Sequence, residues 1–80
     1  MESIRDLLNE LKWRYKKSLD DAEIFYVHRG APGDFRTMNG SEIKDIGRSF
    51  IKTRESHIPY HRVFKIKYKG EVIFERERDD

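Results

Sequence analysis

The dipeptide His-Arg occurs twice in this chain of 80 residues, at His28-Arg29 and at His61-Arg62. An arginine guanidinium offers a fork of donors that fits phosphate or carboxylate, and an imidazole beside it donates a hydrogen bond or titrates near neutral pH. Both pairs lie where an expected strand meets a proline-containing irregular segment, and scaffolds commonly carry their functional groups at such places. If the fold brings the two pairs together, they predict a compact anion-binding site.

The first pair opens the segment HRGAPGD, residues 28–34. Gly30 and Gly33 permit unusual dihedral angles, and successive backbone amides in such a loop can form a concavity that binds an anion beside Arg29. Two other interpretations stay open, because Asp34 can hold the fork of Arg29 or can simply cap a tight turn. Spacing alone favours the plain turn, and the segment does not match the Walker A pattern of phosphate-binding loops.

The second pair closes the segment HIPYHR, residues 57–62, and leads into a strand with two alternating faces. One face holds His61, Val63, Lys65 and Lys67. The opposite face, which is expected to meet the core, holds Phe64, Ile66 and Tyr68. The cations of the first face, with Arg62 beside them, suit an anionic ligand, although an ordinary solvated sheet face has the same composition.

Aromatic residues are frequent, and their positions on the expected strands predict that nearly all of them belong to the core. Tyr60 is the exception, because it stands between Pro59 and the second His-Arg pair. We expect its ring to be available for stacking on a nucleobase, an interaction worth roughly 1–3 kcal/mol where it occurs.

The histidines suggest two further functions, metal binding and acid-base catalysis. His57 and His61 are four residues apart, but Pro59 argues against a helix there and no third ligand is evident, so no metal site is predicted. His28 and His61 resemble a general base and acid, as in cyclic phosphodiesterases. Those enzymes carry His-x-Thr or His-x-Ser pairs, which this chain lacks, so no catalytic residue is assigned and no cofactor is expected.

Composition indicates a small soluble domain spanning residues 1–80. The chain has no cysteine, and neither a signal peptide nor a long apolar run is visible, so we expect a cytoplasmic protein without a membrane partner. Its 17 basic and 15 acidic residues give a net charge of +2. Acidic residues cluster at 20–23 and at the C-terminus, so the remainder is more basic than the total suggests.

The hydrophobic pattern predicts one helix and several strands. An amphipathic helix is expected over residues 3–17, capped by Ser3, with Trp13 away from the centre of its apolar stripe. Strands are expected at 23–29, 35–38, 49–53, from 60 or 61 to 68, and 71–76, with a capped helical turn at 41–44. The predicted architecture is α+β, with the N-terminal amphipathic helix packed on an antiparallel sheet of about four or five strands.

The two motifs also resemble a known family. YVHRGAPGD at 26–34 and IPYHR at 58–62, with Gly40-Ser41, Gly47-Arg48 and Gly70-Glu71-Val72 in order, are similar to a small, mainly archaeal and long uncharacterised family. That family is named the RNA cyclic-group end recognition domain. The resemblance implies binding of RNA termini such as a 2′,3′-cyclic phosphate, in RNA processing or repair. The positions that match the family motifs are His28, Arg29, Gly30, Asp34, His61 and Arg62.

Together these observations predict an RNA-binding domain that is not an enzyme. In this hypothesis Arg29 and Arg62 bind the phosphate, and His28 and His61 donate to phosphate or ribose oxygens. The backbone from Gly30 to Gly33 shapes the pocket. Lys65 and Lys67 steer the RNA electrostatically.

Two alternatives remain. In the first, the chain is a metal-independent enzyme of the cyclic phosphodiesterase type. In the second, it is an interaction module that binds an RNA-processing enzyme through the helix face around Trp13. The expected partner is RNA with a phosphate-bearing 3′ end, and the expected state is a monomer or a weak dimer.

Overall fold

The N-terminal helix α1 spans Ile4–Arg14 in the computed structural model, which describes residues 3–14 and 18–77. Ser3 caps it, since its Oγ accepts the amide of Asp6 at 3.1 Å. Ile4, Leu8 and Leu11 are buried, which confirms the predicted apolar stripe; the expected last turn, 15–17, lies outside the described residues. No helix in the described part of the chain is long and apolar enough to cross a bilayer.

Seven strands follow the helix in the described residues. They are β1 (Ala22–Val27), β2 (Phe35–Asn39), β3 (Ile43–Ile46), β4 (Phe50–Thr53), β5 (His57–Pro59), β6 (Val63–Tyr68) and β7 (Glu71–Glu75). Short 3₁₀ helices connect several of them: η1 (Ser18–Asp21), η2 (Pro32–Asp34), η3 (Gly40–Glu42) and η4 (Tyr60–Arg62).

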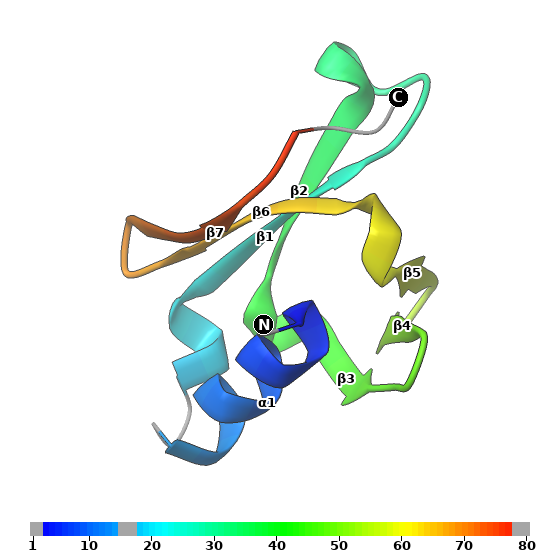
Figure 1. Ribbon diagram of the computed structural model, residues 1–80. Coiled ribbons are helices and arrows are strands. Elements are labelled where there is room, and N and C mark those ends of the chain that lie inside the picture. The colour runs from blue at the N-terminus through cyan, green and yellow to red at the C-terminus, as the bar shows by residue number, and fades with distance from the viewer. Residues whose placement is uncertain (1–2, 15–17, 78–80) are drawn as a thin grey trace.

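The strands form two antiparallel sheets, one of four strands in the order β2-β1-β6-β7 and one of three in the order β3-β4-β5. The larger sheet forms one layer, and α1 lies on its lower side together with the smaller sheet (Figure 1). The fully buried side chains Leu8, Ile24, Ile51, Val63 and Ile66 join these layers in one core. The α+β prediction is confirmed, with the strands divided between two sheets.

The smaller sheet contains two strands that the sequence analysis does not predict. A helical turn is present at η3, where Asn39 and Glu42 form a reciprocal capping box. That turn ends at Glu42, and the next four residues pair with β4 as β3. The three-residue strand β5 then adds to the other side of β4. Such short strands carry too few alternating positions to be recognised in sequence.

A bulge in β6 overturns the predicted faces of that strand. Tyr26 of β1 is paired with Val63 and its neighbour Phe25 with Lys65, so the register shifts by one residue at Phe64. Val63 and Ile66 are both fully buried in consequence. The prediction that Val63 shares a polar face with the lysines and that Phe64 joins the core row is therefore wrong.

The start of β6 also differs from the prediction. The strand begins at Val63, and the expected first residues form the 3₁₀ turn η4. This turn is tied to the smaller sheet, because Tyr60 Oη donates to the carbonyl of Gly47 at 2.6 Å. It is tied to the larger sheet by Arg76, whose Nη2 donates to the Tyr60 carbonyl at 2.7 Å and whose Nε donates to the Val63 carbonyl at 2.9 Å.

The Tyr60 hydroxyl yields a prediction about stability. Burial raises the pKa of Tyr60 above its ordinary value of about 10; Arg5 lowers this pKa and Asp45 raises it, both by smaller amounts. At neutral pH, Tyr60→Phe should lower the free energy of unfolding by about 1 kcal/mol, because the Gly47 carbonyl loses its donor. The change is measured by urea denaturation.

The sign of the pH dependence follows from the raised pKa. The folded state favours the neutral phenol, so this stabilisation is complete below pH ~10 and is lost as the pH rises through the pKa of the folded protein. Above pH ~10 the wild type should therefore lose stability faster than Tyr60→Phe, whose other groups titrate identically. Parallel losses in the two proteins would show that the hydroxyl is not buried as described.

Candidate functional site

The loop after β1 is closed by its own hydrogen bonds. The amide of His28 donates to the Asp34 carbonyl at 2.9 Å, that of Ala31 to the His28 carbonyl at 3.2 Å, and that of Asp34 to the Ala31 carbonyl at 2.8 Å. The Gly30 amide donates to Asp34 Oδ1 at 3.3 Å. Gly33 has a φ of 74° inside η2, where a side chain would be strained. Of the interpretations left open, the structure favours the capped turn, since these amides are used within the loop.

The pairing of β1 with β6 brings the two motifs together. Because these strands are antiparallel and Tyr26 is opposite Val63, the residues that follow β1 come beside those that precede β6. His28 and Arg62 consequently line one hollow of about 290 Å³. The complete lining is Tyr26, His28, Arg36, Glu55, Ser56, His57, Ile58, Pro59 and Arg62. We call this hollow the end groove.

The second guanidinium and the second imidazole of the end groove were not assigned an anion-binding role in the sequence analysis. Arg36 belongs to β2 and is paired with Tyr26, and His57 begins β5. His57 stands in the same HIPYHR segment as Arg62, so its neighbourhood was a usable signal. The sequence carried no such signal for Arg36, because its position in the groove depends on the pairing of β2 with β1.

The charges of the end groove are positive on balance. Arg36 and Arg62 are both exposed, and within residues 3–14 and 18–77 neither is paired with a carboxylate. Glu55 is the one carboxylate in the lining. The groove therefore presents two guanidinium forks and two imidazoles to a ligand, a donor set that fits a phosphate group.

A larger hollow adjoins the end groove. Its volume is about 550 Å³, and it shares Tyr26, Arg36, Glu55, Ser56 and Ile58 with the end groove. Its other lining residues include the cations Lys44 and Arg54 and the carboxylate Glu42. The two hollows together extend along the gap between β2 and the smaller sheet, so a ligand longer than a single phosphate group has room beside the end groove.

Several predicted site residues are not in the end groove. Arg29 and His61 are exposed, on the 28–34 loop and on η4, and neither lines the groove. Gly30, Gly33 and Asp34 form the closed loop. Tyr60 is half-buried against the core with its hydroxyl engaged, so the structure uses its ring and hydroxyl to hold η4.

Lys65 and Lys67 lie on the opposite face of the larger sheet. Both ammonium groups lie over the Phe25 ring, at 5.2 and 5.5 Å from its centroid. Lys65 Nζ is also 3.6 Å from Glu75 Oε2. Phe25 and Tyr26 are successive strand residues that face opposite ways, and Tyr26 lines the end groove, so the lysines are turned away from it.

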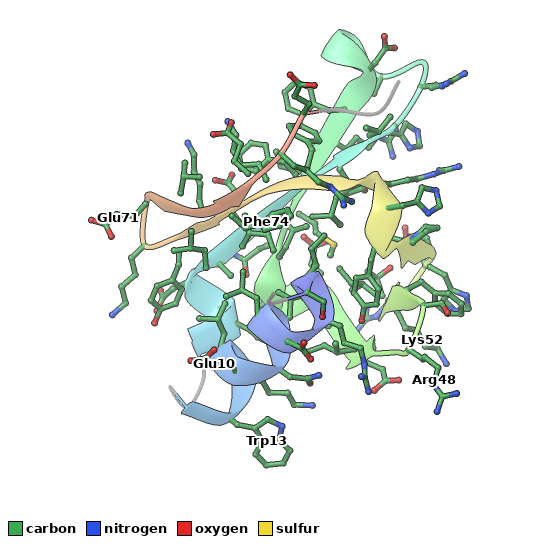
Figure 2. The ribbon with its side chains drawn as sticks, in the orientation of Figure 1. Glu10, Trp13, Arg48, Lys52, Glu71 and Phe74 are labelled. Atoms are coloured by element: carbon green, nitrogen blue, oxygen red, sulfur yellow. The ribbon has the colours of Figure 1, made fainter. Side chains whose placement is uncertain are left out.

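Two other kinds of surface site were considered in the sequence analysis, a metal site and an interaction surface around Trp13. Among the described residues, no three His, Cys, Asp or Glu side chains are grouped so that they could hold a metal ion. Trp13 is 79% exposed on α1, at the far end of the molecule from the larger sheet's upper loop (Figure 2). No residue of α1 lines the end groove, so an interaction surface around Trp13 would be separate from it.

Comparison with known proteins finds a matching family model and several relatives. The family model described as "MJ1316 RNA cyclic group end recognition domain" matches residues 1–76. A UPF0248 protein of Methanococcus vannielii is 37% identical over 75 residues, which are 91% of this chain and 90% of the relative. A UPF0248 protein of Thermococcus onnurineus is 32% identical over 78 residues, 96% of this chain and 88% of the relative.

No solved structure matches this chain. The family match covers both His-Arg motifs and the strands that bring His28 and Arg62 together. The chain belongs to the MJ1316 RNA cyclic group end recognition domain family.

Proposed function

We propose that the protein binds the 3′ end of RNA, and that the terminal phosphate occupies the end groove. In this arrangement Arg36 and Arg62 bind the phosphate oxygens, and His28 and His57 donate to phosphate or ribose oxygens. The observation that carries the proposal is the meeting of His28 and Arg62 in one hollow, although they are far apart in sequence. The family name, which refers to RNA cyclic group ends, supports the same ligand.

The distribution of charge supports an RNA partner. Residues 44–62 contain five Lys or Arg and two carboxylates. This segment includes β4 and β5 of the smaller sheet. Residues 18–43 contain two Arg and five carboxylates. The basic segment supplies six of the nine residues that line the end groove and half of those that line the adjoining hollow. An RNA strand that leaves the groove therefore stays beside positive charge.

A 2′,3′-cyclic phosphate is the end that we expect the groove to prefer. A 3′-monophosphate carries close to two negative charges at neutral pH, whereas the cyclic phosphate is a diester with one. A site that responded to charge alone would therefore prefer the monophosphate. Preference for the cyclic end requires that the donors match its shape, and the four donor side chains that line one hollow can approach the phosphate from several directions. Glu55 lines both hollows, and in this proposal it accepts a hydrogen bond from a ribose 2′-hydroxyl farther along the strand.

The first experiment measures affinity for one short RNA with 2′,3′-cyclic phosphate, 3′-phosphate and 3′-hydroxyl ends, at two salt concentrations. Preference for the cyclic end that survives added salt supports the proposal. Equal affinities that fall steeply with salt would indicate general RNA binding. No binding to any of the three would contradict it.

Hydrolysis is the second candidate function, because two histidines line the same groove. A base and an acid across a cyclic phosphate are what ring opening needs. The cyclic-end RNA is incubated with the protein in the absence of metal, and the end is then analysed. A terminal monophosphate that no longer forms with His57→Ala would make the protein an enzyme, and an unchanged cyclic end would leave it a binding domain.

The end groove predicts a specific effect of Arg62. Arg62→Ala should weaken binding of the cyclic end by about 10- to 100-fold, because a charge-assisted hydrogen bond is worth about 1.5–3 kcal/mol, and should weaken binding of the hydroxyl end much less. Lys12→Ala is the control, since it removes one charge from an exposed position on α1. Equal losses for all three ends would show that Arg62 contributes charge only.

The lysines of the opposite face predict a different pattern. Lys67→Ala should lower affinity slightly and equally for all three ends, because Lys67 acts only through the long-range field. The loss should disappear in 0.5 M salt, where the field is screened within about 4–5 Å. A changed preference among the three ends would place Lys67 in contact with the RNA terminus and contradict the assignment.

A further inference from the structure

Two rings form an exposed stack on the outer face of the smaller sheet. The centroids of Phe50 and His57 are 4.7 Å apart, with 14° between the ring planes. Phe50 is 38% exposed and His57 is also exposed. Ile51 and Ile58, the next residues along the same two strands, are buried. The core therefore takes the isoleucines, and the two aromatic rings are left on the solvent side.

This ring pair adjoins the end groove. His57 belongs both to the stack and to the groove lining. Pro59, which also lines the groove, is the strand partner of Phe50. A ligand whose phosphate lies between His28 and Arg62 consequently has the ring pair within reach of the group attached to that phosphate.

The surroundings of the ring pair are basic. Residues 45–54 contain three cations, Arg48, Lys52 and Arg54, and one carboxylate, Asp45, which is the partner of Lys52 on β3. Lys52 is the strand partner of His57. Arg48 and Lys52 extend to solvent on the same side of the molecule (Figure 2). Exposed aromatic rings bordered by cations are the composition of surfaces that bind single-stranded nucleic acid.

We propose that the nucleobase of the terminal nucleotide stacks on the Phe50–His57 pair while its phosphate occupies the end groove. The inference rests on the proposed RNA function and adds to it a second point of contact, made with the base. Stacking uses the π-face that all four bases possess, so this contact accepts any terminal base. The end groove then recognises the phosphate, and the ring pair holds the nucleotide without reading sequence.

Another explanation is that the rings only stabilise the pairing of β4 with β5. Cross-strand aromatic pairs contribute roughly 0.2–1 kcal/mol to a sheet. The two explanations differ in what happens when the ligand lacks a base. If the rings only stabilise the sheet, removal of the terminal base does not change the affinity for RNA. If the rings stack on the base, its removal weakens binding.

The experiment compares two RNAs with the same cyclic phosphate end, one with a normal terminal nucleotide and one whose terminal nucleotide is abasic. The wild type should bind the abasic RNA about tenfold more weakly. Phe50→Ala should bind both RNAs with the same, reduced affinity, because the ring pair that forms the stacking surface is broken. Phe50→Trp should restore the difference between them, since tryptophan also offers a ring to the base.

Two variants control for side effects. Ile73→Ala shortens a side chain that is as exposed as Phe50, 38%, on a strand of the larger sheet. Trp13→Ala removes an exposed ring from α1. Both should keep the wild-type preference for the normal nucleotide. Thermal unfolding of each variant shows whether a change in binding reflects a change in stability.

The outcomes separate this inference from the proposed function. Equal affinity of the wild type for the normal and abasic ends, with cyclic-end preference retained, would overturn base stacking and leave the end groove intact. A preference for the normal nucleotide that survives in Phe50→Ala would place the base elsewhere and overturn the assignment to this ring pair. Absence of binding to either RNA would overturn both proposals.

Discussion

The antiparallel pairing of β1 with β6 is the constraint on which the rest of the structure depends. Ile24 and Ile66 are opposite each other and fully buried. A slip of one residue would turn Ile66 to the outer face and expose its side chain, so burial of the isoleucine pair strongly favours the observed register. With that register fixed, the end of β1 and the start of β6 meet at one end of the sheet, and so do His28 and Arg62. Core packing thus positions the half-buried His28 and the exposed Arg62 beside each other.

The bulge at Phe64 and the turn η4 determine where the second His-Arg pair lies. The bulge lets Val63 enter the core while the chain bends away from β1. Arg76 then donates to the carbonyls of Tyr60 and Val63, and the Tyr60 carbonyl also accepts the amide of Val63 that closes the turn. The aromatic ring and hydroxyl of Tyr60 fasten the same turn to the smaller sheet. Arg62 therefore projects from a backbone that is held on two sides.

The sequence was sufficient for the elements whose signals are local. The helix was predicted from the spacing of Ile4, Leu8 and Leu11, and the β6–β7 turn from Lys69-Gly70, where both residues have positive φ. It was insufficient where tertiary pairing decides. Alternation assumes an unbroken strand, and one bulge reversed the predicted faces of 63 and 64. The grouping of Arg36 with His28 needs the β1–β2 pairing, and the exposure of Phe50 needs a sheet whose strands are too short to predict.

The two faces of the larger sheet show that a cationic side chain indicates a ligand site only when its surroundings are known. Lys65 and Lys67 looked like ligand-binding residues in sequence, yet both lie over Phe25, and Lys65 is near Glu75. An exposed pair of this kind is worth at most about 1 kcal/mol and does not hold a ligand in one geometry. Arg36 and Arg62 are in the opposite situation, since they approach one hollow from different strands and turns. Recognition of a small phosphate end depends on donors that converge from several directions, because convergence distinguishes a cyclic phosphate from any other negative charge.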